Sequence, residues 1–426
     1  MENKKTKKNI LLKVKNFYSN NSLLFNCIIL SGFFMANCFL PFFSFITYGF
    51  ALICVLFDKL KKGFSYLLFT VPFVCMHLPL SPILFAVVGL TFIIKLLIIK
   101  IKNNKESFKV NWLLIVLYLL FVVYCFVPIN GPYNLVRFYK SGCLAILLLF
   151  IYAMIIFPEE FNLRFNFKVL LFAMFVSSGI SLLRPYSSLL QQNVYIYQIE
   201  EYFRFSGLFS NPNTFALVCD LGVCFMGYYL VSKNPKFTDG LTFIGFSVLG
   251  ILTFSKTFMI ICTINTIIIF ARAIFSRSKI LASCCLLYLL MVTGFVVFAP
   301  GYINLYLERF MVDLSQNPEA VMNSITTERF NLWVKYFNYI ISNPIVLIVG
   351  CGLGAPMLGP LSSHNLYIAA LYQLGIVGSV IFLALVITLF VSAFKKAGTK
   401  VSVAVIIPTF SIMLIGLIED LMFYLF

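Results

Sequence analysis

Apolar runs of about 17–22 residues recur from one end of this chain to the other, and they decide what it can fold into. Each run is long enough to cross a hydrocarbon core about 30 Å thick as an α-helix. Only 11% of the residues are charged, against about 25% in soluble proteins. We therefore predict an all-α, polytopic transmembrane helical bundle of about 12–14 spans. The predicted spans are 23–39, 41–57, 64–79, 81–99, 111–128, 139–157, 169–183, 213–231, 240–254, 257–275, 279–299, 376–394 and 401–417.

The distribution of basic residues predicts the orientation of the spans. With a cytoplasmic N-terminus, the inner segments hold 24 of the 32 Lys and Arg residues and the outer segments hold eight. This is the positive-inside pattern, so the net charge of +17 reflects membrane topology rather than nucleic-acid binding. The first apolar run lacks a small-residue cleavage site after it, which predicts an uncleaved anchor.

The predicted segments differ strongly between the two sides of the membrane. The inner loops are short and basic, whereas two outer segments are large. An asymmetric chain of this kind is expected to work on its outer face. The predicted organisation is a cytoplasmic basic tail (1–22), N-terminal transmembrane helices (23–183), a periplasmic loop (184–212), transmembrane helices (213–299), a large periplasmic loop (300–375) and C-terminal transmembrane helices (376–426).

The two outer loops carry different patterns. In the first, tyrosines such as Tyr186, Tyr197 and Tyr202 could stack on sugar rings, but we favour an amphipathic helix lying at the membrane interface. In the second, residues 327–338 are expected to form a helix. A glycine-rich stretch follows, in which backbone can come close to a ligand. The cysteines lie mostly inside apolar runs without metal-ligand spacing, so we expect neither a disulfide framework nor a metal site.

Four cationic or ionisable residues fall near the outer ends of spans: Arg204, Lys256, Arg329 and His364. Arginine and lysine suit the recognition of a pyrophosphate, since they bind oxyanions and can stabilise a negatively charged leaving group. An imidazole can take a proton from a hydroxyl near neutral pH. His364 is one of only two histidines. The alternative for each cation is contact with lipid phosphates at the membrane surface.

Further candidates surround these residues. Asn213 belongs to the Asn-Pro-Asn segment that follows Arg204 in the sequence, and Asn365 directly follows His364. We expect both asparagines to bind substrate. Arg137, near another outer end, is expected to bind either substrate or lipid phosphate. Asp220 lies inside a span, where a carboxylate is costly, so we expect it to pair with a cation or assist a base. The second histidine, His77, is interpreted as structural.

Short motifs in the C-terminal half resemble those of a known family. His364-Asn365, nine residues, Gly375, two residues and Gly378 resemble the His-Asn-x9-Gly-x-x-Gly signature of bacterial O-antigen ligases and the related O-antigen polymerases. Residues 204–207 and 211–213 resemble the Arg-x-x-Gly and Asn-Pro-Asn segments of that superfamily.

Two further segments extend the resemblance. The sequence LTFSKTF is similar to the family's Leu-Ser-x-Ser-Arg-Gly segment, with Lys256 in place of the usual Arg and Thr257 in place of the Gly. Residues 327–329 with Trp333 are similar to the Arg-bearing helix of the large periplasmic loop. The motifs cover about residues 200–380, and the N-terminal half matches only as a run of membrane helices.

The resemblance implies a GT-C-like, metal-independent glycosyltransferase of the bacterial inner membrane, with its active site facing the periplasm. Its substrates would be glycans on undecaprenyl pyrophosphate, with no cofactor, and a chain-length regulator protein is a candidate partner. His364 would take the acceptor proton or orient the acceptor. Arg204, Arg329 and Lys256 would hold the pyrophosphate.

Three activities remain open. We favour an O-antigen polymerase, which joins the growing chain to a new lipid-linked repeat, because the Asn-Pro-Asn segment and the aromatic loop are more typical of polymerases. An O-antigen ligase, which transfers the glycan to lipid A-core, is the first alternative. A lipid-linked sugar transporter is the second, although the expected repeats and deep charged cavity are not visible in the sequence.

Overall fold

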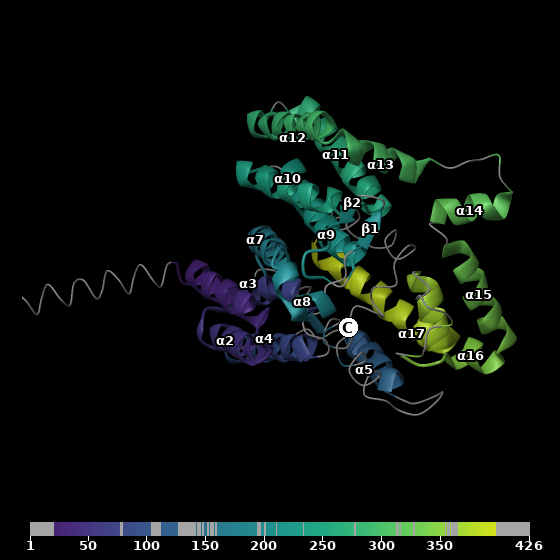
Figure 1. The fold of residues 1–426 in the computed structure, drawn as a ribbon. Coiled ribbons are helices and arrows are strands. Elements are labelled where there is room, and N and C mark those ends of the chain that lie inside the picture. Colours follow the sequence, from purple (N-terminus) through teal and green to yellow (C-terminus); the bar gives the residue numbers. More distant parts are fainter. Residues whose placement is uncertain are drawn as a thin grey trace, which may run out of the picture. The chain divides into compact units, whose positions relative to one another are not determined.

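The computed structural model describes most of the chain. The described residues are 21–76, 80–103, 112–126, 160–193, 197–199, 202–209, 211–232, 234–276, 278–311, 317–326, 329–353 and 365–397, with a few single positions between them. Within these ranges the protein is predominantly helical, and two short strands form one hairpin. Figure 1 shows the elements and their order along the chain.

The chain divides into two compact units, and the first comprises residues 1–105, 160–195 and 207–210. It begins with an apolar helix over Asn21–Asn37. Its other helices are α2 (Phe43–Phe57), α3 (Leu60–Thr70), η1 (Val71–Phe73), α4 (Leu80–Asn103), α7 (Leu163–Ser181), η3 (Arg184–Tyr186) and α8 (Ser188–Asn193). Helix α3 packs against α2, α4 and α7, which makes it the centre of this unit.

The second unit contains the remaining elements. They are α5 (Trp112–Phe126), β1 (Tyr197–Ile199), β2 (Tyr202–Arg204), α9 (Pro212–Val231), α10 (Phe237–Ile251), α11 (Lys256–Ser276), α12 (Lys279–Phe298), α13 (Pro300–Phe310), α14 (Pro318–Thr326), α15 (Arg329–Ser342), α16 (Pro344–Val349) and α17 (Leu366–Ala397). Two groups of packed helices can be followed within it. Helices α9–α12 form one group, and α5, α15, α16 and α17 form the other.

The described part of the chain contains six helices long and apolar enough to cross a membrane. They are α4, α7, α9, α11, α12 and the Leu366–Thr388 part of α17. Four shorter apolar helices coincide with other predicted spans: Asn21–Asn37, α2, α5 and α10. The prediction of a helical protein with many candidate membrane spans is thus supported. These helices indicate a multi-pass membrane protein.

Helix boundaries differ most from the predicted spans in two places. The predicted span 64–79 is shorter, because α3 ends at Thr70 and Pro72, which has no N–H to donate, lies in the one-turn η1 helix that follows. Helix α17 begins at Leu366 rather than at 376, and it contains a break at Gly375. The predicted span 401–417, most of 139–157 and His77 lie outside the described residues.

The aromatic loop after α8 differs from its prediction. Tyr197 and Tyr202 lie in the antiparallel strands β1 and β2, whose register pairs Tyr197 with Arg204 and Ile199 with Tyr202. The amphipathic-helix interpretation is therefore wrong for these two tyrosines. Aromatic residues favour strands when a cross-strand partner is present, and single-sequence patterns do not show that partner.

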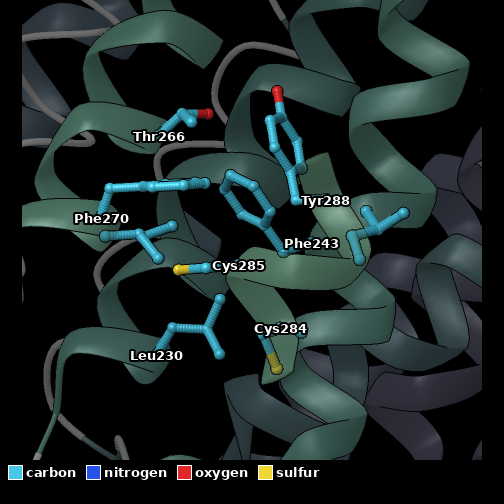
Figure 2. A pocket seen from close by; sticks show the side chains of 10 residues that line it. Leu230, Phe243, Thr266, Phe270, Cys284, Cys285 and Tyr288 are labelled. Carbon is cyan, nitrogen blue, oxygen red and sulfur yellow. The ribbon is translucent and has the colours of Figure 1, made fainter. Parts of the chain in front are cut away.

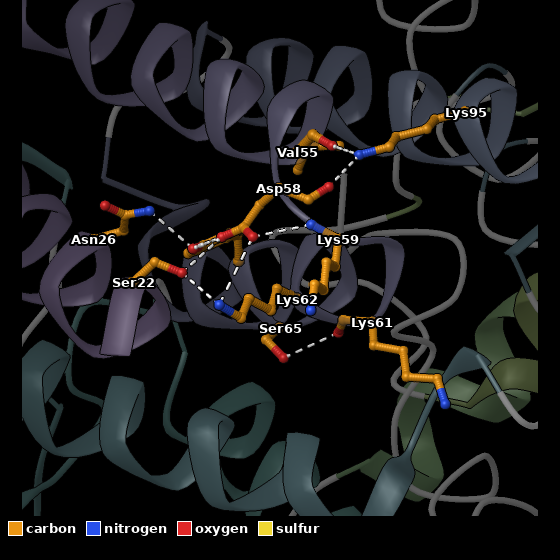
Figure 3. A network of polar contacts seen from close by, with 10 residues as sticks. Ser22, Asn26, Val55, Asp58, Lys59, Lys61, Lys62, Ser65 and Lys95 are labelled. Carbon is orange, nitrogen blue, oxygen red and sulfur yellow. Dashed lines mark hydrogen bonds and ion pairs between the residues drawn. The ribbon is translucent and has the colours of Figure 1, made fainter. Parts of the chain in front are cut away.

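A polar network around Asp58 joins four helices of the first unit (Figure 3). The Asp58 carboxylate accepts hydrogen bonds from Ser22 Oγ at 3.1 Å and Tyr66 Oη at 2.7 Å, and it lies 3.7 Å from Lys62 Nζ. From α4, Lys95 Nζ donates to Val55 O at 2.7 Å, near the end of α2. Asp58 follows α2 directly, so one carboxylate ties the first helix, α2 and α3 together.

We predict that Asp58→Ala destabilises the first unit. Removing the carboxylate leaves the partly buried groups of Ser22, Tyr66 and Lys62 without their common acceptor, at a cost of about 1–3 kcal/mol. Thermal unfolding of the purified protein in detergent measures the loss. Lys61→Ala is the matched control, because the Lys61 side chain is exposed and points away from the network. Equal unfolding temperatures for the two variants would contradict this account.

Candidate functional site

The Asn-Pro-Asn segment begins α9, and each of its residues has a distinct task. Asn211 is the N-cap, and its side-chain oxygen accepts a hydrogen bond from Asn213 N at 2.8 Å. Pro212 occupies the first helical position, where its missing N–H costs nothing. Asn213 Oδ1 then accepts a hydrogen bond from Arg204 Nη2 at 2.7 Å. The segment therefore starts the helix and holds the arginine of the neighbouring motif.

Arg204 also secures the turn between α10 and α11. Its Nε donates to Thr253 O at 3.0 Å, and the next backbone amide, Phe205 N, donates to Leu252 O at 2.9 Å. These carbonyls follow the end of α10, where the last C=O groups of a helix lack helical partners. The strand that carries Arg204 thus caps α10, and the guanidinium is fixed between α9 and this turn.

Aromatic side chains from α13 brace the same turn. Phe254 has a φ of 54°, which is uncommon for a residue with a side chain, and it is fully buried. Its ring stacks against Tyr302 and Tyr306, with centroids 5.2 and 4.8 Å away. Tyr306 Oη also donates to Ile251 O. The strained residue, two positions before Lys256, is therefore held in place by packing against α13.

Three of the predicted cations lie at or beside the first turn of a helix. Lys256 is the first residue of α11, Arg329 is the first described residue of α15, and Arg204, which ends β2, is bonded to Asn213 in the first turn of α9. The macrodipole is positive at this end of a helix, so a cation there is disfavoured by about 0.3–1 kcal/mol. An anion bound beside such a cation gains from both the charged side chain and the positive end of the helix dipole.

The His-Asn motif stands at the start of α17. The Oδ1 atom of Asn365 accepts hydrogen bonds from Tyr367 N at 3.0 Å and Ile368 N at 3.1 Å, which makes this buried residue the N-cap of the helix. The predicted substrate contact of Asn365 stays a prediction, and capping is a role that sequence reasoning did not assign. His364 precedes the cap and lies outside the described residues.

The two glycines of this motif lie where backbone and ring approach α17 closely. Gly375 has a φ of 63° and interrupts the helix, and a Cβ there would overlap the backbone of Gly350. A Cβ on Gly378 would overlap the ring of Tyr124 from α5. Tyr124 Oη lies 2.8 Å from Val349 O and 2.7 Å from Leu374 O. Sequence reasoning missed Tyr124, which is one aromatic residue within an apolar run.

Asp220 lies inside the α9–α12 group of helices. Its side chain is buried, and Oδ1 has no hydrogen-bond partner among the described residues. Direct contact with a sugar would require the surrounding packing to open, so its predicted substrate binding stays a prediction. An intramembrane carboxyl group is nevertheless costly enough to indicate a function.

A small cavity lies among the same four helices, lined by Leu230, Phe243, Thr266, Cys285 and Tyr288 among others (Figure 2). Its volume of about 10 Å³ is room for about one water molecule. This cavity is too small for a glycan. Within the described residues, no group of three or more His, Cys, Asp and Glu side chains is placed to hold a metal ion.

The structure brings together some of the predicted site residues. Arg204 and Asn213 are in contact, and the turn that Arg204 binds leads directly into Lys256. Arg329 and Asn365 belong to the second group of helices, and their meeting with Arg204 stays a prediction. Arg137 lies outside the described residues, like His364.

Comparisons with known proteins add no assignment. No protein-family model matches the chain, and no curated protein or solved structure shows a significant match to it.

We predict that Gly378→Ala destabilises the second group of helices. The added methyl group must displace the Tyr124 ring, and overpacking of this kind costs about 1–3 kcal/mol. Gly294→Ala in α12 is the matched control, because a Cβ there meets nothing within 4 Å. That control should be neutral or stabilising, since alanine favours helices. Thermal unfolding compares them, and equal stability of the two variants would contradict the Tyr124 contact.

Proposed function

We propose that this protein is a glycosyltransferase of the bacterial inner membrane that works on the periplasmic side, and that it is an O-antigen polymerase. Its donor is a glycan on undecaprenyl pyrophosphate, and its acceptor is the terminal sugar of a new repeat unit on a second carrier. The observation that carries the proposal is the set of cations at or beside the first turns of helices, at Arg204, Lys256 and Arg329.

The proposed reaction requires two kinds of group. The acceptor hydroxyl attacks the anomeric carbon of the donor, the bond from that carbon to the pyrophosphate oxygen breaks, and His364 takes the hydroxyl proton. The leaving group departs as an anion, which Arg204, Lys256 and Arg329 stabilise. A pyrophosphate leaving group is already activated, so the mechanism needs no nucleotide.

The rigid setting of Arg204 supports this assignment. Hydrogen bonds to Asn213 and Thr253 fix the guanidinium plane against α9 and the α10–α11 turn. Little conformational entropy of this side chain is therefore lost when substrate binds. The same turn positions the start of α11, because Ser255 Oγ accepts a hydrogen bond from Phe258 N at 3.3 Å. Lys256 is thereby placed at a capped helix start beside the arginine's anchor.

Two alternatives remain. An O-antigen ligase would use the same donor chemistry and differ only in its acceptor. A lipid-linked sugar transporter would be expected to use a broken helix whose exposed carbonyls bind a coupling ion. Helix α17 is broken, but the carbonyls of Tyr372, Gln373 and Leu374 beside the break all accept hydrogen bonds from protein groups, which favours a transferase.

Lipopolysaccharide from a strain deleted for this gene, separated on a gel, tests the proposal. A polymerase leaves a band of core plus one repeat, because ligation survives when polymerisation is lost. Core alone, with long chains accumulating on undecaprenyl pyrophosphate, would identify a ligase instead. An unchanged ladder would contradict both transferase activities.

Variants of Lys256 test the pyrophosphate site. Lys256→Ala should lower transfer about ten- to a hundredfold, because a charge-assisted contact is worth about 1.5–3 kcal/mol. Lys256→Arg should retain activity, since it restores the family's usual residue. Arg272→Ala, at the exposed opposite end of α11, is the matched control and should be neutral. The rate of glycan polymerisation in membranes measures all three, and full activity of Lys256→Ala would contradict the assignment.

A further inference from the structure

The segment between α15 and α17 contains an apolar helix that stops abruptly. Helix α16 has the sequence PIVLIV and ends at Gly350, which has a φ of 77°. Gly352 also has a positive φ, of 89°. Two left-handed glycines within three residues turn the chain sharply where the helix ends. The short helix and its turn therefore form one compact element.

This element is docked onto the break in α17 by backbone hydrogen bonds. Cys351 N donates to Tyr372 O and Gly352 N donates to Gln373 O, each at 2.8 Å. Tyr124 Oη lies within hydrogen-bond distance of the last carbonyl on each side, at Val349 and Leu374, and its single proton is donated to one of them at a time. Most of the carbonyl groups that the two helix ends would leave without partners are thus paired with protein donors rather than with water.

The position of this junction along α17 indicates its depth. Gly375 lies nine residues after Leu366, which begins the 23-residue candidate span Leu366–Thr388. At about 1.5 Å per residue, the junction is about 14 Å from the start of the span, close to halfway across a core of about 30 Å. Irregular backbone is tolerated at that depth only where protein buries it or water fills a cavity. Leu353, directly after the turn, is buried.

The sequence around α16 is also typical of a segment that lies within the membrane. Residues 336–394 contain no Asp, Glu, Lys or Arg. One membrane span requires about 20 residues of this uncharged stretch. The other residues are also uncharged, whereas about a quarter of the residues in a soluble protein are charged, so they do not resemble an aqueous loop.

We propose that residues 344–353 form a re-entrant membrane segment, which enters from the predicted outer face and turns back at Gly350–Gly352. Its partner is the hydrocarbon of the outer leaflet. Ile345 and Ile348 are 66% and 52% exposed, and on α15 Phe337 and Ile341 are 50% and 53% exposed. The neighbouring face of α15, about 100° around the helix, is already occupied, since Tyr336 and Ile340 are fully buried in the cluster that contains Tyr372. The exposed apolar surface therefore faces lipid chains. This inference is independent of the proposed enzymatic activity.

Tryptophan fluorescence in lipid vesicles tests the proposal. A single tryptophan is introduced by Ile348→Trp in a chain whose own tryptophans are replaced by Trp112→Phe and Trp333→Phe. Val380→Trp, on an exposed position of α17, is the lipid-facing control. Glu319→Trp, on the exposed first turn of α14, is the aqueous control. Each variant is required to elute as a single species from a sizing column.

Ile348→Trp should lose fluorescence to phospholipids brominated along their acyl chains as Val380→Trp does, and it should resist acrylamide. Quenching by acrylamide, as for Glu319→Trp, would place the segment in water and overturn the proposal. Resistance to both quenchers would mean that protein, such as a second copy of the chain, covers the surface, and would also overturn it. If these variants do not fold, a photoreactive phospholipid on the unaltered chain replaces them. Crosslinks within 344–348 are expected, and their absence beside crosslinks at Val380 would contradict the assignment.

Discussion

In the hydrocarbon core of a membrane, a backbone carbonyl that loses its helical partner has no water to replace it. Two segments of this chain are places where a helix stops: the α10–α11 turn, near the predicted outer boundary, and the break at Gly375 within α17. After α10, Tyr306, Phe205 and Arg204 donate to the carbonyls of residues 251–253. Within α17, Tyr124 and the turn after α16 do the same for residues 372–374. The motifs thus lie where helix interruptions are stabilised by side chains and by neighbouring backbone.

Cations lie at or next to the starts of the helices beside the α10–α11 turn. Arg204 is held by the first turn of α9, and Lys256 begins α11 after the strained residue Phe254. A cation at a positive helix end is unfavourable until an anion arrives, so the arrangement favours ligands such as a pyrophosphate over neutral ones. This preference for an anionic ligand underlies the proposed transferase activity. A polymerase and a ligase would share it, because they differ only in the acceptor.

Periodicity and run length predicted most of the helices, since a long apolar run has few alternatives in a membrane. The starts of α9, α11 and α12 fall within one residue of the predicted spans. The strand pairing of Tyr197 with Arg204, the break at Gly375 and the contribution of Tyr124 were not predicted. The break at Gly375 and the contribution of Tyr124 depend on partners far along the chain, and the hairpin depends on a cross-strand pairing that an apolar-run pattern does not show. The motif glycines were recognised by spacing, but only the structure shows that backbone or an aromatic ring occupies the space of their missing side chains.

The most direct test of the central claim is transfer by the purified protein in vesicles that contain undecaprenyl-pyrophosphate-linked repeat units, with products identified by mass spectrometry. The account predicts lipid-linked dimers and longer oligomers, together with free undecaprenyl pyrophosphate in equal amount to the new linkages. These products should form without added nucleotide and should be lost in His364→Ala. Vesicles in which the repeat units only change sides, with no new glycosidic linkage, would contradict the account and identify a transporter.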